Sequence, residues 1–171
     1  RLEHRARPCP VDHGRDAATG KNHGGQSDRE RTTWIVTNAK NLNARFKQNP
    51  GVVDILPSIL NHMNLSAPED IQKELDGVPF IGPVEVADLR AEKMGENIRL
   101  TWKNLNNSKN DRVEIYFTET NNFKDGKKDS YKKAGNTTAD AETFTFPAKS
   151  NSSFYKILVK APHHYINTWI K

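Results

Sequence analysis

The sequence has few hydrophobic residues and almost no cysteine. Hydrophobic residues make up 35% of the 171 positions, below the usual share, so we expect a modest core. Cys9 is the single cysteine, which excludes an internal disulfide and leaves the redox compartment open. No apolar run reaches the roughly 18 residues that a membrane-spanning helix needs. The first ten residues, RLEHRARPCP, lack the apolar centre of a signal peptide.

Aromatic residues are also few near the positive charge. The net charge is +5, and Lys127, Lys128, Lys132 and Lys133 stand among Asn, Asp and Gly in segments that we expect to be loops. No aromatic residues alternate with these lysines, as a base-stacking surface would require. The pattern therefore favours a solvated surface, and we expect no nucleic-acid partner.

A turn-rich segment, DGVPFIGP at Asp76–Pro83, divides the chain into predicted domains at 1–83 and 84–171. Before it, the β-branched run Thr32–Asn38 predicts a strand buried on both faces. The spacing of apolar residues over Val52–Met63 predicts a helix, with Pro57 near its first turn. Ser66–Glu69 predicts a capping-box start for a short helix through Leu75. We expect the Val52–Leu65 stripe to pack on the second domain.

After the division, apolar residues alternate with polar ones. This period of two predicts six or seven short strands and an antiparallel β-sandwich. The alternating positions are Val84, Val86 and Leu89; Ile98, Leu100 and Trp102; Val113, Ile115 and Phe117; Phe144 and Phe146; Tyr155, Ile157 and Val159; and Tyr165, Ile166 and Trp169.

Three features of residues 84–171 resemble a fibronectin type III-like or immunoglobulin-like domain. They are the opening VEVADLRAE, Trp102 near the end of the predicted second strand, and the later strand FYKILVKA. The resemblance implies that Trp102 lies in the core between two sheets. A small antiparallel sandwich of another topology is the alternative.

Asp12 and His13 are adjacent, and His23 follows ten residues later. Gly14 permits a backbone bend that would let the carboxylate and imidazole reach one cation. Such mixed oxygen and nitrogen donors suit zinc, with manganese as an alternative, but three donors are too few for two ions. By spacing alone, ordinary loop positions explain these residues better than a metal site does.

The longer string DHGRD…GKNHGGQSDRERTTWIVTN, then VDILPSILNHMNL and LDGVPF, resembles the C-terminal metal-binding segment of the alkaline phosphatase superfamily. Its phosphodiesterase/nucleotide pyrophosphatase, sulfatase and phosphoglycerate mutase branches look most similar. The resemblance covers about residues 11–82. It implies an α/β segment in which Asp12 and His13 bind one metal, usually zinc, and His23 binds the other. Arg15 would contact an anionic substrate, although simple solvation explains it equally well.

The family's nucleophile and other ligands come from earlier in the chain, whereas ten residues precede Val11. Those ten contain two prolines and three arginines, which cannot form the buried strand expected before Asp12. We therefore expect a fragment, and a shifted reading frame would explain both observations. His62 is expected to be exposed on its helix, and His163 and His164 to lie in a loop between strands.

The overall expectation is an α+β chain, in which a partial α/β phosphatase segment of one strand plus helices packs beside the sandwich. Its function would be that of a C-terminal fragment of a two-metal phosphoester or sulfate ester hydrolase, inactive alone. We expect a bacterial protein exported to the periplasm or cell surface. The alternative is a non-catalytic module whose sandwich contacts a glycan or a protein.

Overall fold

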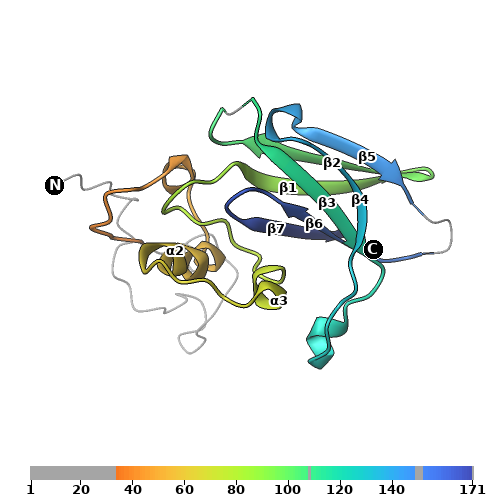
Figure 1. Cartoon of the computed structure of the whole chain (residues 1–171), viewed down its shortest axis with the longest axis horizontal. Coiled ribbons are helices and arrows are strands. Elements are labelled where there is room, and N and C mark those ends of the chain that lie inside the picture. Colours follow the sequence, from red (N-terminus) through yellow and green to blue (C-terminus); the bar gives the residue numbers. More distant parts are fainter. Residues whose placement is uncertain (1–33, 108, 149–151, 171) are drawn as a thin grey trace, which may run out of the picture. The chain divides into compact units, whose positions relative to one another are not determined.

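Two antiparallel sheets make up the second half of the chain (Figure 1). The structure, a computed structural model, describes residues 34–107, 109–148 and 152–170. The three-stranded sheet has the order β1-β2-β5 and the four-stranded sheet the order β4-β3-β6-β7. The strands are β1 (Val86–Met94), β2 (Asn97–Asn104), β3 (Arg112–Thr118), β4 (Lys132–Thr138), β5 (Thr143–Pro147), β6 (Tyr155–Lys160) and β7 (Tyr165–Ile170).

The core lies between these sheets, because the alternating apolar residues of both point into one buried cluster. Trp102 is buried there, as predicted, and its Nε1 donates a hydrogen bond to Ala139 O at 2.8 Å. The rings of Phe117 and Phe146 stack across the sheets with centroids 5.3 Å apart. These observations confirm the predicted β-sandwich.

Strand β4 is the one strand that the sequence did not predict. Lys132 and Lys133 lie on it rather than in a loop, so that expectation was wrong, while Lys127 and Lys128 do lie outside the strands. The segment KKAGNTT has no apolar alternation and is held by backbone pairing with β3. A Cβ at Gly135 would lie 2.6 Å from Phe144 Cζ, so close packing explains the glycine.

The predicted strand at Thr32–Asn38 is not seen over its described part. Residues 34–38 belong to no helix or strand, and Trp34 and Val36 are exposed. The prediction of a strand buried on both faces was therefore wrong for these residues. A β-branched run forms a strand only where a neighbour accepts its backbone hydrogen bonds, and none of the described strands pairs with it. Compact packing divides the chain between Lys40 and Asn41, and the unit from Asn41 onward contains the described helices and the sandwich.

The helical part of this unit is short. It comprises the 3-10 turns η1 (Ala44–Lys47) and η2 (Val52–Asp54) and the helices α2 (Ile55–His62) and α3 (Glu69–Gln72). The predicted helix is confirmed, with Pro57 in its first turn. The predicted capping box is wrong: α3 begins after Pro68, which makes no side-chain cap, and it ends before Leu75. Two more 3-10 turns, η3 (Asn122–Asp125) and η4 (Ala139–Ala141), lie in the sandwich loops.

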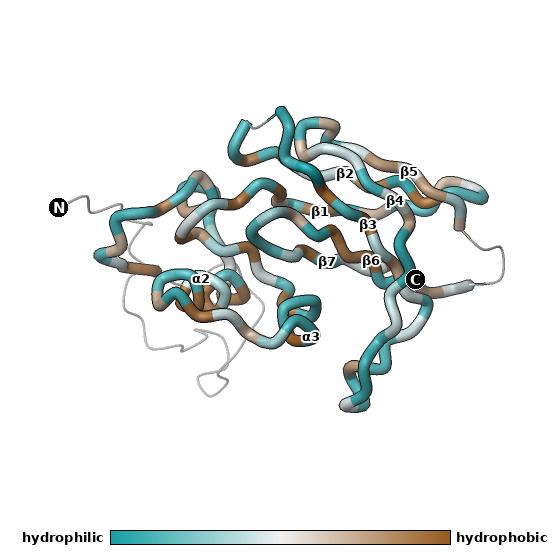
Figure 2. Tube along the Cα trace, in the orientation of Figure 1, coloured by the Kyte–Doolittle hydropathy of each residue, from teal (hydrophilic) through white to brown (hydrophobic). Residues whose placement is uncertain are grey.

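Helix α2 buries the face opposite to the apolar one that we expected to be buried. Pro57 and Ser58 are buried, whereas Leu56, Ile59 and Met63 are 52%, 48% and 59% exposed. Hydrophobic colour accordingly marks the helix in Figure 2. The expectation that the apolar stripe packs on the sandwich was wrong, because a buried carboxylate holds the polar face inward.

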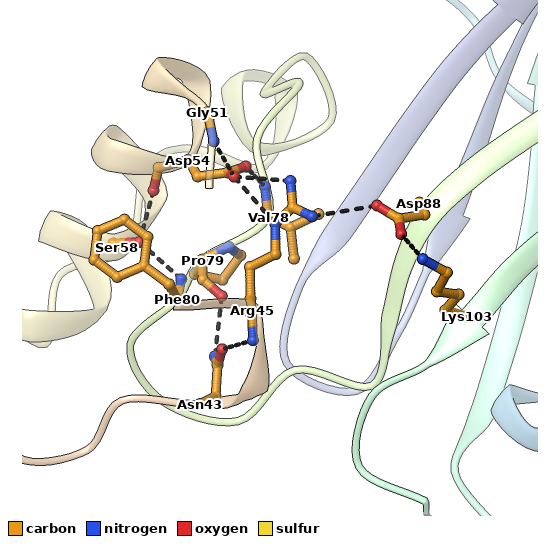
Figure 3. Close-up of polar contacts among 10 residues, drawn as sticks. All are labelled: Asn43, Arg45, Gly51, Asp54, Ser58, Val78, Pro79, Phe80, Asp88 and Lys103. Carbon is orange, nitrogen blue, oxygen red and sulfur yellow. Dashed lines mark hydrogen bonds and ion pairs between the residues drawn. The ribbon is translucent and has the colours of Figure 1, made fainter. Parts of the chain in front are cut away.

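That carboxylate is Asp54, which is 1% exposed and directly precedes α2. Its Oδ2 accepts hydrogen bonds from Gly51 N at 2.9 Å and from Arg45 Nε and Nη2 at 3.1 and 2.9 Å. Its Oδ1 accepts one from Val78 N at 2.6 Å. Arg45 Nη1 also reaches Asp88 Oδ1 on β1 at 3.2 Å. This Asp54 cluster joins η1, α2, the connector and the sandwich (Figure 3).

The connector between helices and sandwich is buried rather than a solvent-exposed linker. Val78, Phe80 and Ile81 are each 4% exposed. Ser58 Oγ donates to Asp54 O and accepts from Phe80 N, at 2.6 and 2.8 Å. Asn43 Nδ2 donates to Pro79 O and Gly82 O, at 3.0 and 2.8 Å. Side chains therefore satisfy several backbone polar groups of this segment, and backbone bonds from Asn43 N to Phe80 O and from Gly82 N to Asn41 O satisfy others, which allows the segment to be buried.

Replacing Asp54 by Asn should lower the free energy of unfolding by about 3 kcal/mol or more, since it leaves Arg45 and a buried amide without a matched acceptor. The matched control is Asp88→Asn, which removes a partly exposed carboxylate from the same guanidinium and should cost less than about 1 kcal/mol. Urea unfolding followed by far-UV circular dichroism measures both. If both variants lost the same free energy of unfolding, Asp54 would not be the main carboxylate that holds this cluster together.

Candidate functional site

The predicted metal ligands Asp12, His13 and His23, and the predicted substrate contact Arg15, lie outside the described residues. Within the described ranges, no group of three or more His, Cys, Asp or Glu side chains is arranged to hold a metal ion. The zinc site therefore stays a prediction. No described helix is long and apolar enough to cross a membrane. His62 is exposed, as predicted.

Glu85, His163 and His164 lie together in the described residues, and we name them the Glu85–histidine cluster. Glu85 lies directly before β1 and is 1% exposed. His163 and His164 lie, as predicted, in the loop between β6 and β7. His163 Nδ1 is 2.5 Å from Glu85 Oε1, and His164 Nδ1 is 3.4 Å from Glu85 Oε2. One buried carboxylate thus faces two imidazoles.

Hydrogen-bond partners assign the protons of these rings. His164 Nε2 lies 2.8 Å from Val86 O, and a carbonyl only accepts, so this nitrogen donates. His163 Nδ1 donates to the carboxylate by the same logic. His163 is 54% exposed. A carboxylate that fixes the imidazole tautomer in this way orients histidine bases and metal ligands in many sites.

The Glu85 carboxyl is held in its charged form. Burial would raise its pKa, but contacts with His164 and His163, and their positive charge when protonated, lower the pKa from 4.5 to about 2. The attraction to the imidazoles therefore exceeds the cost of burial. The cluster ties the β6–β7 loop to the beginning of β1.

A small pocket of about 100 Å³ lies beside the cluster. His163, His164 and Tyr165 form one side, and residues of α2 and the α2–α3 turn, including Asn61 and Ser66, form the other. Its lining contains no carboxylate, lysine or arginine. The space suits a few water molecules rather than a phosphate or sulfate ester, because its volume is well below that of ordinary small-molecule sites. The main effect of the cluster is to fix the β6–β7 loop.

The signal for this cluster in the sequence is weak. Glu85 stands between Val84 and Val86, where alternation predicts an exposed side chain, yet all three residues are buried. His163 lies 78 residues further along, and His164 follows it. A carboxylate inside an apolar run was the available hint, and its partners became visible only in the fold.

Comparisons with known proteins identify no family. No protein-family model and no curated protein matches the chain. Two crystal structures of pectate lyase Pel3 from Pectobacterium carotovorum are 17% and 18% identical, with TM-scores of 0.35 and 0.32; each match covers 47% of this chain and 24% of the lyase. A DUF3823 family protein from Bacteroides ovatus is 24% identical, with a TM-score of 0.30, and the match covers 50% of this chain and 51% of that protein. The chain thus spans about a quarter and about half of these proteins, and such scores define neither fold nor activity.

The lowered pKa of Glu85 predicts a specific acid sensitivity. Because its folded pKa lies below the ordinary value, the unfolded chain takes up the proton first as pH falls. The stabilisation is therefore fully present above about pH 4.5 and is lost toward pH 2, amounting to about 3 kcal/mol.

Glu85→Gln should be less stable than the parent near pH 6, and this difference should shrink as pH falls from about 4.5 to 2. Urea unfolding at several pH values measures it. Glu92→Gln, at an exposed position of β1, is the control and should follow the parent at every pH. A difference between the Glu85 variant and the parent that does not change with pH would contradict the assignment.

Proposed function

We propose that this chain is the C-terminal part of a two-metal phosphoester or sulfate ester hydrolase, with an accessory β-sandwich, in an exported bacterial protein. The observation that supports the proposal is the outward-facing apolar stripe of α2. That helix belongs to the segment, residues 11–82, that resembles the end of an alkaline phosphatase superfamily domain.

The stripe is an unusual surface for a helix in a folded unit. Its exposed large hydrophobic residues are Val52, Val53, Leu56, Ile59, Met63 and Leu65. Isolated apolar residues are common on surfaces, but a cluster of this kind marks a place where another protein layer packs. The Asp54 cluster fixes the helix, so the stripe cannot turn inward without breaking buried hydrogen bonds. A larger α/β domain that packs on α2 accounts for the arrangement.

The proposed metal site follows from the resemblance to the alkaline phosphatase superfamily. Asp12 and His13 would hold the metal that also binds the nucleophile, His23 would hold the other, and Arg15 would contact the substrate anion. One carboxylate and two imidazoles suit zinc, but they are too few for two ions. Two bound ions would activate the nucleophile and balance charge on the substrate oxygens. The nucleophile and remaining ligands would come from polypeptide outside these 171 residues, and the chain alone would not hydrolyse esters.

The sandwich would be a fibronectin type III-like accessory domain. Its three-plus-four strand arrangement, with Trp102 in the core, supports this assignment. It would serve as a spacer or as a binding module. The second candidate function is a non-catalytic interaction protein in which the sandwich does the binding.

We expect this chain to bind zinc but not to hydrolyse esters. We expect zinc uptake, measured by titration calorimetry, to fall in His23→Ala and to be unchanged in His62→Ala, which removes an exposed histidine from α2. Hydrolysis of p-nitrophenyl phosphate, bis-p-nitrophenyl phosphate and p-nitrophenyl sulfate should stay at the background rate with zinc present. Turnover by the parent chain would refute the assignment as an incomplete site, and zinc uptake that is indifferent to His23 would refute the metal site.

The stripe itself can be tested without the metal. The double variant Leu56→Glu/Ile59→Glu should bind less of the fluorescent apolar dye ANS, while its free energy of unfolding changes by less than about 1 kcal/mol, because both side chains are already exposed. Ile115→Ala, in the buried core, is the contrasting variant and should cost about 2–5 kcal/mol. A large loss of stability in the double variant would mean that the stripe is buried within this chain.

A further inference from the structure

The outer face of the four-stranded sheet is covered over part of its area. Glu74 pairs with Lys156, and Asn167 Nδ2 donates to two carbonyls that follow α3. Leu158 lies beside Asn167 in the strand register and is 1% exposed. The more exposed part of the face lies on β3, β4 and the end of β6. We name its six outward-pointing side chains the β3 face; they are Arg112, Glu114 and Tyr116 on β3, Lys133 and Asn136 on β4, and Lys160 on β6.

These side chains share one face because side chains alternate along a strand. Val113 and Ile115 are buried in the core, so the β3 residues on either side of them point outward. The strands β4, β3 and β6 lie side by side (Figure 1). Their register pairs Glu114 with Asn136 on one side and with Lys160 on the other. The polar side chains of three strands therefore meet around Glu114.

The β3 face carries more cations than carboxylates. Glu114 pairs with Lys133. Arg112 instead donates from Nη2 to the neutral amide of Asn136 at 2.8 Å, and within the described ranges it forms no ion pair. Lys160 likewise has no carboxylate partner in that part of the chain. Since Arg112 and Lys160 are diagonal neighbours across β3 and β6, about 7 Å apart, two cations that no carboxylate neutralises stand together.

The carboxylate at the edge of the face does not cancel this charge. Lys160 Nζ lies 5.6 Å from the centroid of the Tyr165 ring, and Tyr165 Oη donates to Glu69 Oε1 at 3.3 Å. Glu69 is already paired with Lys73 at 2.9 Å. The charged groups of the face and this edge are the cations Lys73, Arg112, Lys133 and Lys160 and the carboxylates Glu69 and Glu114. The surplus is positive, so the face attracts an anionic partner.

Tyrosine rings lie among these cations. Lys133 Nζ is 5.7 Å from the centroid of the Tyr116 ring, and Tyr116 Oη donates to Glu114 Oε2 at 2.9 Å. The fold thus sets aromatic rings beside lysines that are distant from them in the chain. Such rings offer a ligand an apolar surface next to polar groups.

This arrangement favours a sugar acid polymer over other anions. A sheet face is open, so it suits an extended chain more than a small molecule, which needs a concave site. A peptide adds to a sheet at its edge, through backbone hydrogen bonds. Closely spaced phosphates or sulfates would place an anion against Glu114, whereas a sugar ring with a single carboxylate also has hydroxyls that can donate to Glu114. Arginine binds a carboxylate through two parallel N–H groups.

We propose that the β3 face binds a polyuronate, which is a sugar chain with one carboxylate on each ring. One carboxylate lies between Arg112 and Lys160, and ring hydroxyls donate to Glu114. The proposal names a ligand for the sandwich and does not depend on the hydrolase assignment, since the chain can fail every metal test and still bind a polyuronate here.

The test uses the isotopically labelled 171-residue chain and two-dimensional amide NMR. The probes are the hexamers of galacturonate and of mannuronate, at low ionic strength. At least one should shift the amides of Arg112, Glu114 and Lys160, with a Kd of about 0.1–1 mM. Added salt should weaken this binding, because it screens exposed charges. The absence of shifts at these amides for both hexamers at about 5 mM would overturn the proposal.

Matched variants show whether the cations of this face are responsible. Arg112→Gln/Lys160→Gln replaces two exposed side chains and should weaken binding by about tenfold or more. Lys124→Gln/Lys127→Gln removes the same charge from exposed positions between β3 and β4 and should leave Kd within about twofold. Equal weakening in the two double variants would overturn the proposal, because the binding would then follow net charge alone.

Three competing probes show whether a sugar acid is the ligand recognised. Maltohexaose, which is neutral, should bind at least about tenfold more weakly than the better uronate hexamer. Hexaglutamate and a heparin hexasaccharide should also bind more weakly, because the first lacks sugar hydroxyls and the second crowds Glu114 with sulfates. Equal binding of maltohexaose, or tighter binding of either polyanion, would overturn the proposal.

Discussion

The buried carboxylate of Asp54 is the constraint on which the arrangement of residues 41–83 depends. It accepts hydrogen bonds from the turn before α2, from η1 and from the connector, and so joins three segments that are separate in sequence. Gly77 permits this geometry, since a Cβ there would lie 2.0 Å from Val53 O. With the polar side of the turn fixed inward, the apolar side of α2 must face outward. The exposed stripe is thus a consequence of hydrogen bonding, not of loose packing.

The contacts between the helical segment and the sandwich are polar as well. Arg45 is shared between Asp54 and Asp88, Glu74 pairs with Lys156 on β6, and Asn167 Nδ2 donates to the carbonyls of Lys73 and Leu75 at 3.2 Å. Buried ion pairs of this kind contribute little net stability, because desolvation offsets attraction, but breaking one is costly. These pairs specify one orientation of the helical segment relative to the sandwich. The segment is therefore held in place by directional contacts while its apolar surface stays free for another layer.

The sequence predicted the elements whose burial follows a simple period. Ile98, Leu100 and Trp102 alternate because one face of β2 is buried, and that pattern is visible without the fold. β4 carries no such pattern, since its place depends on backbone pairing with β3. The spacing of Leu56, Ile59 and Met63 predicted a helix but not which side would meet the sandwich, because Asp54 decides that through residues distant in sequence. Glu85 and His163 are likewise joined only by the fold, and the predicted ligands Asp12, His13 and His23 lie outside the described residues.

The exposed stripe on α2 carries no charge to neutralise, so it suits a protein layer that buries it permanently. The stripe belongs to the helical segment, whereas the two sheets of the sandwich consist of β1 to β7. A protein layer packed on the stripe would therefore leave the strands of the sandwich unaltered, and the polar contacts of Arg45, Glu74 and Asn167 would keep the segment and the sandwich in one orientation. Permanent attachment through α2 and binding by the sandwich are thus compatible in one chain.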